Sequence, residues 1–363
     1  MKDGLSPLEI QFLHLLQLAL GRRDRLCPVP SDAEWEDLFQ LAAKHCVIGL
    51  CVPSLADCPE DLRLCWMGHA ERIADHNRRM NDRCRQLCDK FTRSGYRNCI
   101  LKGQGLALLY PHPQWRQPGD IDVWVSGGRK RLVEMVLRVT GQRGEVMYHH
   151  IDFPVFPDAE VELHFTPSWM FCPWHNRRLQ HWFREQESKV STGNALGVPL
   201  PGREFNAVFV LVHIFRHVFD EGIGLRQIID YFYVLRDAQG QLDEVPALLR
   251  RFGLYRFARA LMWVMGEALA MPRAWMPVEP DERTGRWLLA EILQAGNFGH
   301  HDERNADIFT AGTIRRFHLR WLVTARRLRV FPNEALWEMP WRIGHFLWRW
   351  GKGYLHPLQN NGE

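Results

Sequence analysis

Residues 100–125 constrain the fold of this chain more than any other stretch. The pattern predicts a strand, a glycine-marked turn into a helix, a loop, and a second strand that opens at Asp120 and Asp122. Strand side chains two residues apart share one face, so these two carboxylates point the same way while Ile121 and Val123 point into a core. Aspartate is unfavourable in strands, and neighbouring carboxylates repel each other. The pair therefore predicts a site for a divalent cation.

The turn at Lys102 and Gly103 lies where the first strand meets the helix. Backbone N–H groups at a helix start and a lysine ammonium both favour phosphate. Arg116, in the loop before the second strand, adds another positive charge. Alternatively, Lys102 is an exposed lysine at a strand end, and Arg116 is a loop arginine paired with Asp120. In the first interpretation the segment supplies the parts of a metal–nucleotide site.

A third carboxylate, Glu162, lies in the strand pattern of residues 149–165, which predicts a hairpin. Glu162 and His164 share one face of its second strand. If this hairpin packs on the strand of Asp120 and Asp122, the three carboxylates form a two-metal phosphoryl-transfer centre. In a sheet with one face in water, Glu162 would instead be an ordinary exposed residue. We expect His164 to be a structural neighbour of the metal ligands, not a ligand itself.

These motifs resemble the nucleotidyltransferase superfamily of DNA polymerase β, and more closely its bacterial branch of uncharacterised nucleotidyltransferase family proteins. The matching motifs are Leu101-Lys102-Gly103, Arg116, Gly119-Asp120-Ile121-Asp122 and Val161-Glu162-Leu163-His164. The wider superfamily usually has Gly-Ser where this chain has Lys102-Gly103, and we expect Lys102 to replace that serine on the phosphate.

The resemblance implies transfer of a nucleoside monophosphate from a nucleoside triphosphate, such as ATP, to an acceptor hydroxyl. It implies Mg²⁺ (or Mn²⁺) as the cofactor, bound by Asp120, Asp122 and Glu162. Lys102, Gly103 and Arg116 would bind the nucleotide. The acceptor is left open as a small molecule, a sugar or a protein.

A second informative segment is residues 211–230, in which His213 and His217 lie on one helix face. This spacing suits zinc, but no third ligand is evident. The resembling family carries His, Gly-hydrophobic-Arg and Asp here, which implies that Arg226 contacts the triphosphate from the second domain. Alternatively, Arg226 and Asp230 form a helix salt bridge. His213, His217 and Asp230 are expected to lie next to the site.

The remaining patterns predict an α+β fold. A small mixed-sheet nucleotidyltransferase module, similar to a polymerase β palm, is expected at residues 96–203. Its strands are expected at residues 98–101, 121–125 and 144–148 and in the hairpin 149–165. It lies between an N-terminal helical region, residues 1–95, and a C-terminal helical domain, residues 204–363. A capping-box pattern at Ser31 and a long helix over residues 61–93 support the first of these regions.

Composition narrows the function classes. The formal charge of +4 is too small to predict nucleic-acid binding. Nine cysteines without metal spacing, and no signal-peptide pattern, favour the cytoplasm. Residues 313–330 are basic and amphipathic, and tryptophans follow them. This pattern suits an anionic membrane surface, a nucleic-acid backbone, or a helix whose aromatic rings pack inward. Three functions remain open: an active transferase, a nucleotide-binding module without turnover, and a surface-associated interaction protein.

Overall fold

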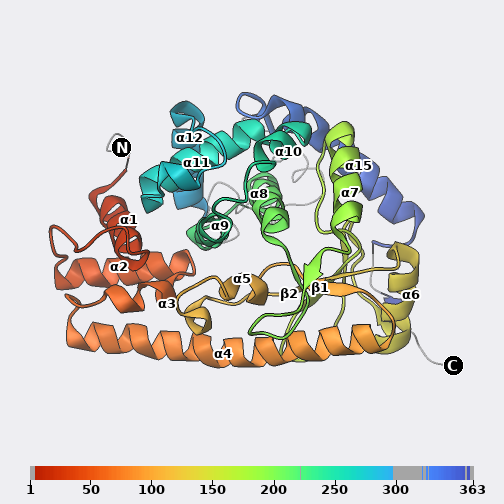
Figure 1. Ribbon diagram of the computed structural model, residues 1–363, viewed down its shortest axis with the longest axis horizontal. Coiled ribbons are helices and arrows are strands. Elements are labelled where there is room, and N and C mark those ends of the chain that lie inside the picture. Colours follow the sequence, from red (N-terminus) through yellow and green to blue (C-terminus); the bar gives the residue numbers. More distant parts are fainter. Residues whose placement is uncertain are drawn as a thin grey trace.

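The computed structural model confirms the α+β class: a small mixed sheet lies among many helices (Figure 1). The structure describes residues 5–220, 222–296, 321, 324–325, 327–355 and 358–359.

The elements follow the predicted order of helices, strands and helices. The first helices are α1 (Pro7–Ala19), α2 (Asp32–Lys44), α3 (Ile48–Cys51) and α4 (Glu60–Arg93). Among the strands lie α5 (Gln104–Ala107), α6 (Arg129–Thr140) and α7 (Pro173–Gln186). The later helices are α8 (Arg203–Asp220), α9 (Leu225–Asp237), α10 (Val245–Arg251), α11 (Tyr255–Leu269), α12 (Glu282–Ala295) and α15 (Pro332–Gly351). Short 3-10 turns are η1 (Val52–Ser54), η2 (Pro113–Trp115) and η3 (Arg273–Trp275).

Helix α4 forms the base on which the other parts rest. Its 34 residues contain no interior proline and span about 50 Å. In Figure 1 it runs beneath both the N-terminal helices and the sheet, and it contacts α3, α5, β1 and β2. It ends at Arg93, and Gly95 takes a left-handed φ of 78° as the chain turns into the sheet. The capping box predicted at Ser31 is confirmed at the start of α2.

The sheet has the order β1-β2-β5-β4. Its strands are β1 (Asn98–Ile100), β2 (Ile121–Val125), β5 (Val161–His164) and β4 (His150–Asp152). Strand β2 is parallel to β5, and the other two pairings are antiparallel. The predicted hairpin of residues 149–165 is confirmed as the β4–β5 pair, and it packs directly on β2.

One strand prediction is wrong. Residues 144–148 were expected to form a strand, but this region holds only β3 (Gln142–Arg143) and one isolated bridge from Val146 to Ile151. The N–H of Met147 donates to the carbonyl of His150, so the chain reverses at once into β4. This tight turn uses the residues that a longer strand would need. Strand β3 pairs instead with β8 (Leu358–Gln359), and β6 (Val190–Ser191) pairs with β7 (Leu200–Pro201).

Both faces of the sheet are covered. On one face, Val123 and Leu163 pack in a core with side chains of α4 and α6. On the other, Trp124 stacks on Phe205 of α8, with ring centroids 5.9 Å apart. The sheet is therefore not one-sided, and polar side chains on its second face point toward protein and not into bulk water.

The helical regions before and after the sheet share one hydrophobic core. Helix α1 packs against α11, and the Gln17 side chain donates to the carbonyls of Glu267 and Ala268. The core extends from Phe12 through the buried length of α8 and α9 to Ala335 in α15. The two regions are far apart in sequence but not in space.

Helix α15 carries the tryptophans of the C-terminal region. Trp341 and Trp348 are half-buried, and Arg342 is ion-paired with Asp220 and Glu338. These aromatic rings pack inward, but the arginine is bound to protein and does not form a basic outer face. The outer face exposes apolar side chains: Leu336, Ile343, Phe346, Leu347 and Trp350. Most of the predicted basic helix, residues 313–330, lies outside the described residues.

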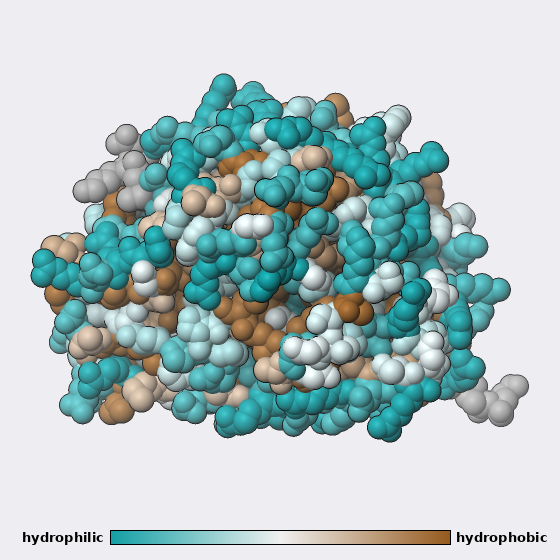
Figure 2. Space-filling model, viewed as in Figure 1, coloured by the Kyte–Doolittle hydropathy of each residue, from teal (hydrophilic) through white to brown (hydrophobic). Residues whose placement is uncertain are grey.

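The face of the molecule drawn in Figure 2 is mostly hydrophilic, with hydrophobic side chains visible in its hollows. None of the described helices is long and apolar enough to cross a membrane.

Candidate active site

Strand register brings the predicted carboxylates together. Asp122 on β2 lies directly opposite Glu162 on the parallel strand β5, so both side chains project from the same face of the sheet. Asp120 lies just before β2. Asp120 and Glu162 line a cavity of about 1090 Å³, whereas Asp122 is 1% exposed and lies behind them. Glu162 is thus a cavity residue, and the alternative of an ordinary exposed strand residue is wrong.

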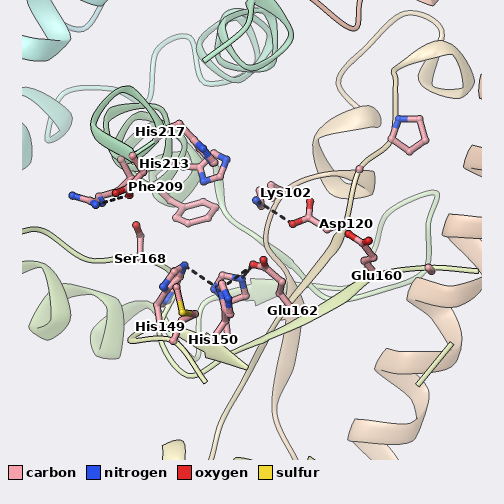
Figure 3. A pocket seen from close by; sticks show the side chains of 18 of the residues that line it. Lys102, Asp120, His149, His150, Glu160, Glu162, Ser168, Phe209, His213 and His217 are labelled. Atoms are coloured by element: carbon pink, nitrogen blue, oxygen red, sulfur yellow. Dashed lines mark hydrogen bonds and ion pairs between the residues drawn. The ribbon is translucent and has the colours of Figure 1, made fainter. Parts of the chain in front are cut away.

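Lys102 contacts both aspartates, and Figure 3 shows it directed at Asp120. Its Nζ is 3.2 Å from Asp122 Oδ1 and 3.8 Å from Asp120 Oδ2. Burial opposes its charge, but the nearby carboxylates raise the pKa of Lys102 above its ordinary value. The lysine therefore carries a permanent positive charge at neutral pH, and it lies on the rim of the cavity as the sequence predicted.

Gly103 makes the turn that carries Lys102. Its φ of 55° is left-handed, and an added Cβ would lie 3.4 Å from the Asp120 carbonyl. The turn can approach β2 because this residue has no side chain. The helix that follows, α5, has only four residues, so it offers less to a phosphate than the predicted helix would.

His164 bridges the carboxylates from the other side. Its Nε2 is 2.9 Å from Asp122 Oδ1 and 3.2 Å from Glu162 Oε2. Burial alone would lower the pKa of His164, but the hydrogen bonds to both carboxylates raise it to about 9. Its Nδ1 faces the Thr166 carbonyl at 3.4 Å. His164 therefore touches two predicted metal ligands, which is closer involvement than the sequence indicated.

Glu162 has a second histidine partner, His150 of strand β4. The distance from His150 Nδ1 to Glu162 Oε2 is 3.0 Å. Burial would raise the pKa of Glu162, but the hydrogen bonds and charges of His150 and His164 hold it well below its ordinary value. Glu162 is therefore an anion at neutral pH.

The donor set suits a divalent cation. Asp122, Glu162 and His164 each offer one ligand atom, and these atoms lie within 4.8 Å of one another. Asp122 Oδ2 is buried and has no hydrogen-bond partner within the described part of the chain. A buried carboxylate oxygen without a partner is costly, and a cation would satisfy it.

Arg116 pairs with Asp230 and not with Asp120. Its guanidinium donates two hydrogen bonds of 2.7 Å to the carboxylate of Asp230 on α9, which also accepts one from Tyr110. Arg116 and Asp230 are both buried. This bidentate pair ties the loop before β2 to α9. The geometry gives Arg116 and Asp230 a positioning role in place of the alternative pairing of Arg116 with Asp120, while the contact of Arg116 with phosphate stays a prediction.

Arg226 supports the same loop from α9. Its guanidinium donates to the carbonyls of Gln117 and Pro118, both at 3.3 Å, and lies against Gly119. Arg226 also lines the cavity next to Asp120. It is therefore placed beside the site, as expected, while two of its hydrogen bonds go to the loop.

His213 and His217 line the cavity from α8, with ring centroids 4.3 Å apart. Burial, with the nearby Lys102 charge, lowers the pKa of His217 to about 4 and that of His213 well below its ordinary value. Both rings are therefore neutral at pH 7. Neither belongs to a cluster of potential metal ligands among the described residues, so the geometry does not support zinc at this pair.

Two further histidines line the cavity without having been predicted as site residues: His149, just before β4, and His150, the first residue of β4. His149 and His150 lie in a hairpin whose turn is centred near Pro157, and pairing around that turn places His150 opposite His164. The spacing could therefore have shown that His150 joins Glu162. The contact from Trp169 Nε1 to His149 Nδ1, 3.1 Å, had no signal in the sequence.

Comparison with known proteins agrees with this geometry. A family model described as uncharacterised nucleotidyltransferase matches residues 31–270. The chain belongs to this family. The match includes the carboxylates of β2 and β5, Lys102 and the α8–α9 segment, so every residue of the nucleotidyltransferase site described above lies inside it.

Two further comparisons were made. No curated protein matches the sequence. Among solved structures, the chain is similar to an antigenic nucleotidyltransferase-like protein from Paracoccidioides brasiliensis, at 14% identity and a TM-score of 0.31. That match covers 57% of this chain and 96% of the other.

Proposed function

We propose that the protein transfers a nucleoside monophosphate from a nucleoside triphosphate to an acceptor hydroxyl and releases pyrophosphate, with Mg²⁺ or Mn²⁺ as the cofactor. The observation that carries this proposal is the pairing of Asp122 with Glu162 across parallel strands, with Asp120 and Lys102 beside them. Family membership supports the class of reaction. The geometry supports divalent-cation dependence, because three carboxylates gather at one end of a cavity.

The charged residues of the site would have different roles in the reaction. Asp120, Asp122 and Glu162 would hold divalent cations, which supply Lewis acidity to the α-phosphate and the acceptor hydroxyl. Lys102 neutralises charge on the triphosphate from its place on the rim. Catalysis of this kind depends on positioning, and the Arg116–Asp230 pair keeps the loop before Asp120 in place. The neutral rings of His213 and His217 form part of the cavity wall and would place no charge next to the nucleotide.

The cavity has room for more than a nucleotide. At about 1090 Å³ it reaches the upper end of the range for small-molecule sites, roughly 300–1,000 Å³. Beyond the carboxylates its wall includes Tyr148, Trp169 and Trp341. This concave shape favours an acceptor hydroxyl that can enter a pocket, such as that of a small molecule or sugar, over one on a flat protein surface.

A direct test is to incubate the protein with each α-labelled nucleoside triphosphate, Mg²⁺ or Mn²⁺, and a fractionated cell extract. We expect pyrophosphate release and a labelled acceptor, both lost in Asp120→Ala. Nucleotide binding without label transfer, across all four nucleotides and both metals, would favour the alternative of a binding module without turnover.

A further inference from the structure

We propose that Asp122, Glu162 and His164 form a resident site for one first-row transition-metal ion of the Mn²⁺ class. This site binds the ion more tightly than Mg²⁺, and binds it without nucleotide. The inference deepens the proposed function because it concerns the same site. It does not depend on turnover, since the ion is expected to bind to the protein alone.

The spacing of the donor atoms supports a single shared ion. Two ligands that bind one ion at about 2.1 Å and at right angles lie about 3 Å from each other. His164 Nε2 lies 2.9 Å from Asp122 Oδ1 and 3.2 Å from Glu162 Oε2. All three atoms belong to the paired strands β2 and β5, whose register fixes them on one face.

The surroundings of the donors support the same conclusion. A metal-binding histidine commonly directs its other ring nitrogen at a backbone carbonyl, and His164 Nδ1 faces the carbonyl of Thr166. The ligating carboxylates in such sites are themselves held by hydrogen bonds, and His150 holds Glu162. Asp122 Oδ2 is buried and without a hydrogen-bond partner among the described residues, and is thus available as a further ligand.

The position of Lys102 determines where the resident ion lies relative to Asp122. Its ammonium already fills the interval between Asp120 and Asp122. Toward Glu162, Asp122 faces the ring nitrogen of His164, which can bind a metal ion once its proton is released, whereas the Lys102 ammonium on the same Asp122 oxygen has no lone pair to offer. One resident ion therefore fits there, while a cation that arrives with the triphosphate would meet the more exposed Asp120.

The ligand types determine which metal is preferred. Mg²⁺ binds oxygen ligands and keeps several of its waters, whereas imidazole nitrogen favours divalent transition-metal ions. Two carboxylates and one imidazole therefore select against Mg²⁺. Mn²⁺ is the best probe, because the exposed thiols of Cys27 and Cys65 can bind Zn²⁺ elsewhere on the chain.

The test uses the full chain, stripped with EDTA and dialysed, with no nucleotide. MnCl2 and MgCl2 are titrated separately by calorimetry, and bound Mn²⁺ is studied by pulsed EPR for coupling to a nitrogen nucleus. We expect one Mn²⁺ per chain, at least tenfold weaker Mg²⁺ binding, and a nitrogen coupling. In His164→Gln the coupling should disappear and Mn²⁺ affinity should fall at least tenfold. The exposed histidine variant His181→Gln serves as the matched control and should behave as the wild type.

Equal affinity for Mg²⁺ and Mn²⁺ in the wild type, or bound Mn²⁺ without nitrogen coupling, would overturn the proposal, and neither result requires the variant to fold. A nitrogen coupling that survives in folded His164→Gln would also overturn it. Failure of the proposed function would look different: Mn²⁺ would bind with nitrogen coupling, yet no nucleotide would release pyrophosphate.

Discussion

The buried pair of Arg116 and Asp230 allows a sharp test of a positioning role against a nucleotide-binding role. The side chains are 5% and 6% exposed and share two hydrogen bonds of 2.7 Å. Replacing one member leaves the other buried without its partner, which typically costs about 3–5 kcal/mol. Because natural domains are stable by only about 5–15 kcal/mol, Arg116→Met should lower the free energy of unfolding by a large fraction.

The assay is urea unfolding followed by circular dichroism for Arg116→Met, Asp230→Asn and the double variant. In a double-mutant cycle the double variant should lose clearly less than the sum of the single losses, because the second change removes an already unpaired group. The exposed pair of Arg93 and Asp89 provides the control, and its disruption should have little effect.

The reasoning is refuted if Arg116→Met unfolds at the wild-type urea concentration while its affinity for a nucleoside triphosphate falls tenfold or more. That result would place the guanidinium on the phosphates, as the sequence motif first indicated. Loss of stability with nucleotide affinity retained, measured well below the unfolding transition, would support the positioning role.

Three other predictions follow from the site. Lys102→Met should weaken triphosphate binding roughly ten- to a hundredfold, since a charge-assisted contact contributes about 1.5–3 kcal/mol; unchanged affinity by calorimetry would contradict this. The carboxylates raise the pKa of His164 to about 9, so its protonated form stabilises the fold fully below pH 6.5, and this contribution is lost as the pH rises through 9. With EDTA present to remove metal, the urea midpoint should therefore fall between pH 7 and pH 10, and it should fall less steeply in His164→Gln. Gly49→Ala should lower the melting temperature, because its Cβ would overlap the Trp115 backbone beside the loop of Arg116; a normal melting curve would argue against that close packing.

Local periodicity predicted much of the site. Alternation along β2 and β5 placed Asp122 and Glu162 on polar faces, and the turn between the strands of the hairpin gave the pairing of β4 with β5. The Lys102–Gly103 turn was read correctly because left-handed glycine and a strand end leave a strong local signal. These features depend on neighbours within a few residues, which a single sequence displays directly.

Long-range pairing explains most of what the sequence did not show. Arg116 meets Asp230 across 114 residues, and no local pattern marks an arginine for one buried carboxylate over another. The cover on the second face of the sheet comes from α8, and without it Glu162 could not be distinguished from an exposed strand residue. The false strand at residues 144–148 has a local cause, because apolar alternation cannot reveal a tight reversal at its end.

The charges of the site explain how it can fold before any cation binds. Lys102 compensates Asp120 and Asp122, and His164 compensates Asp122 and Glu162. Repulsion between the carboxylates is therefore offset within the protein, and metal is not needed to hold β2 and β5 in register. The two cations differ in freedom: the lysine is a point charge on a flexible stem, whereas the imidazole is held by a backbone carbonyl. We expect Lys102 to turn from the aspartates to the phosphates when a triphosphate enters, which would uncover Asp120 for the incoming cation. We expect His164 to stay beside both carboxylates and to release its proton when it becomes a metal ligand.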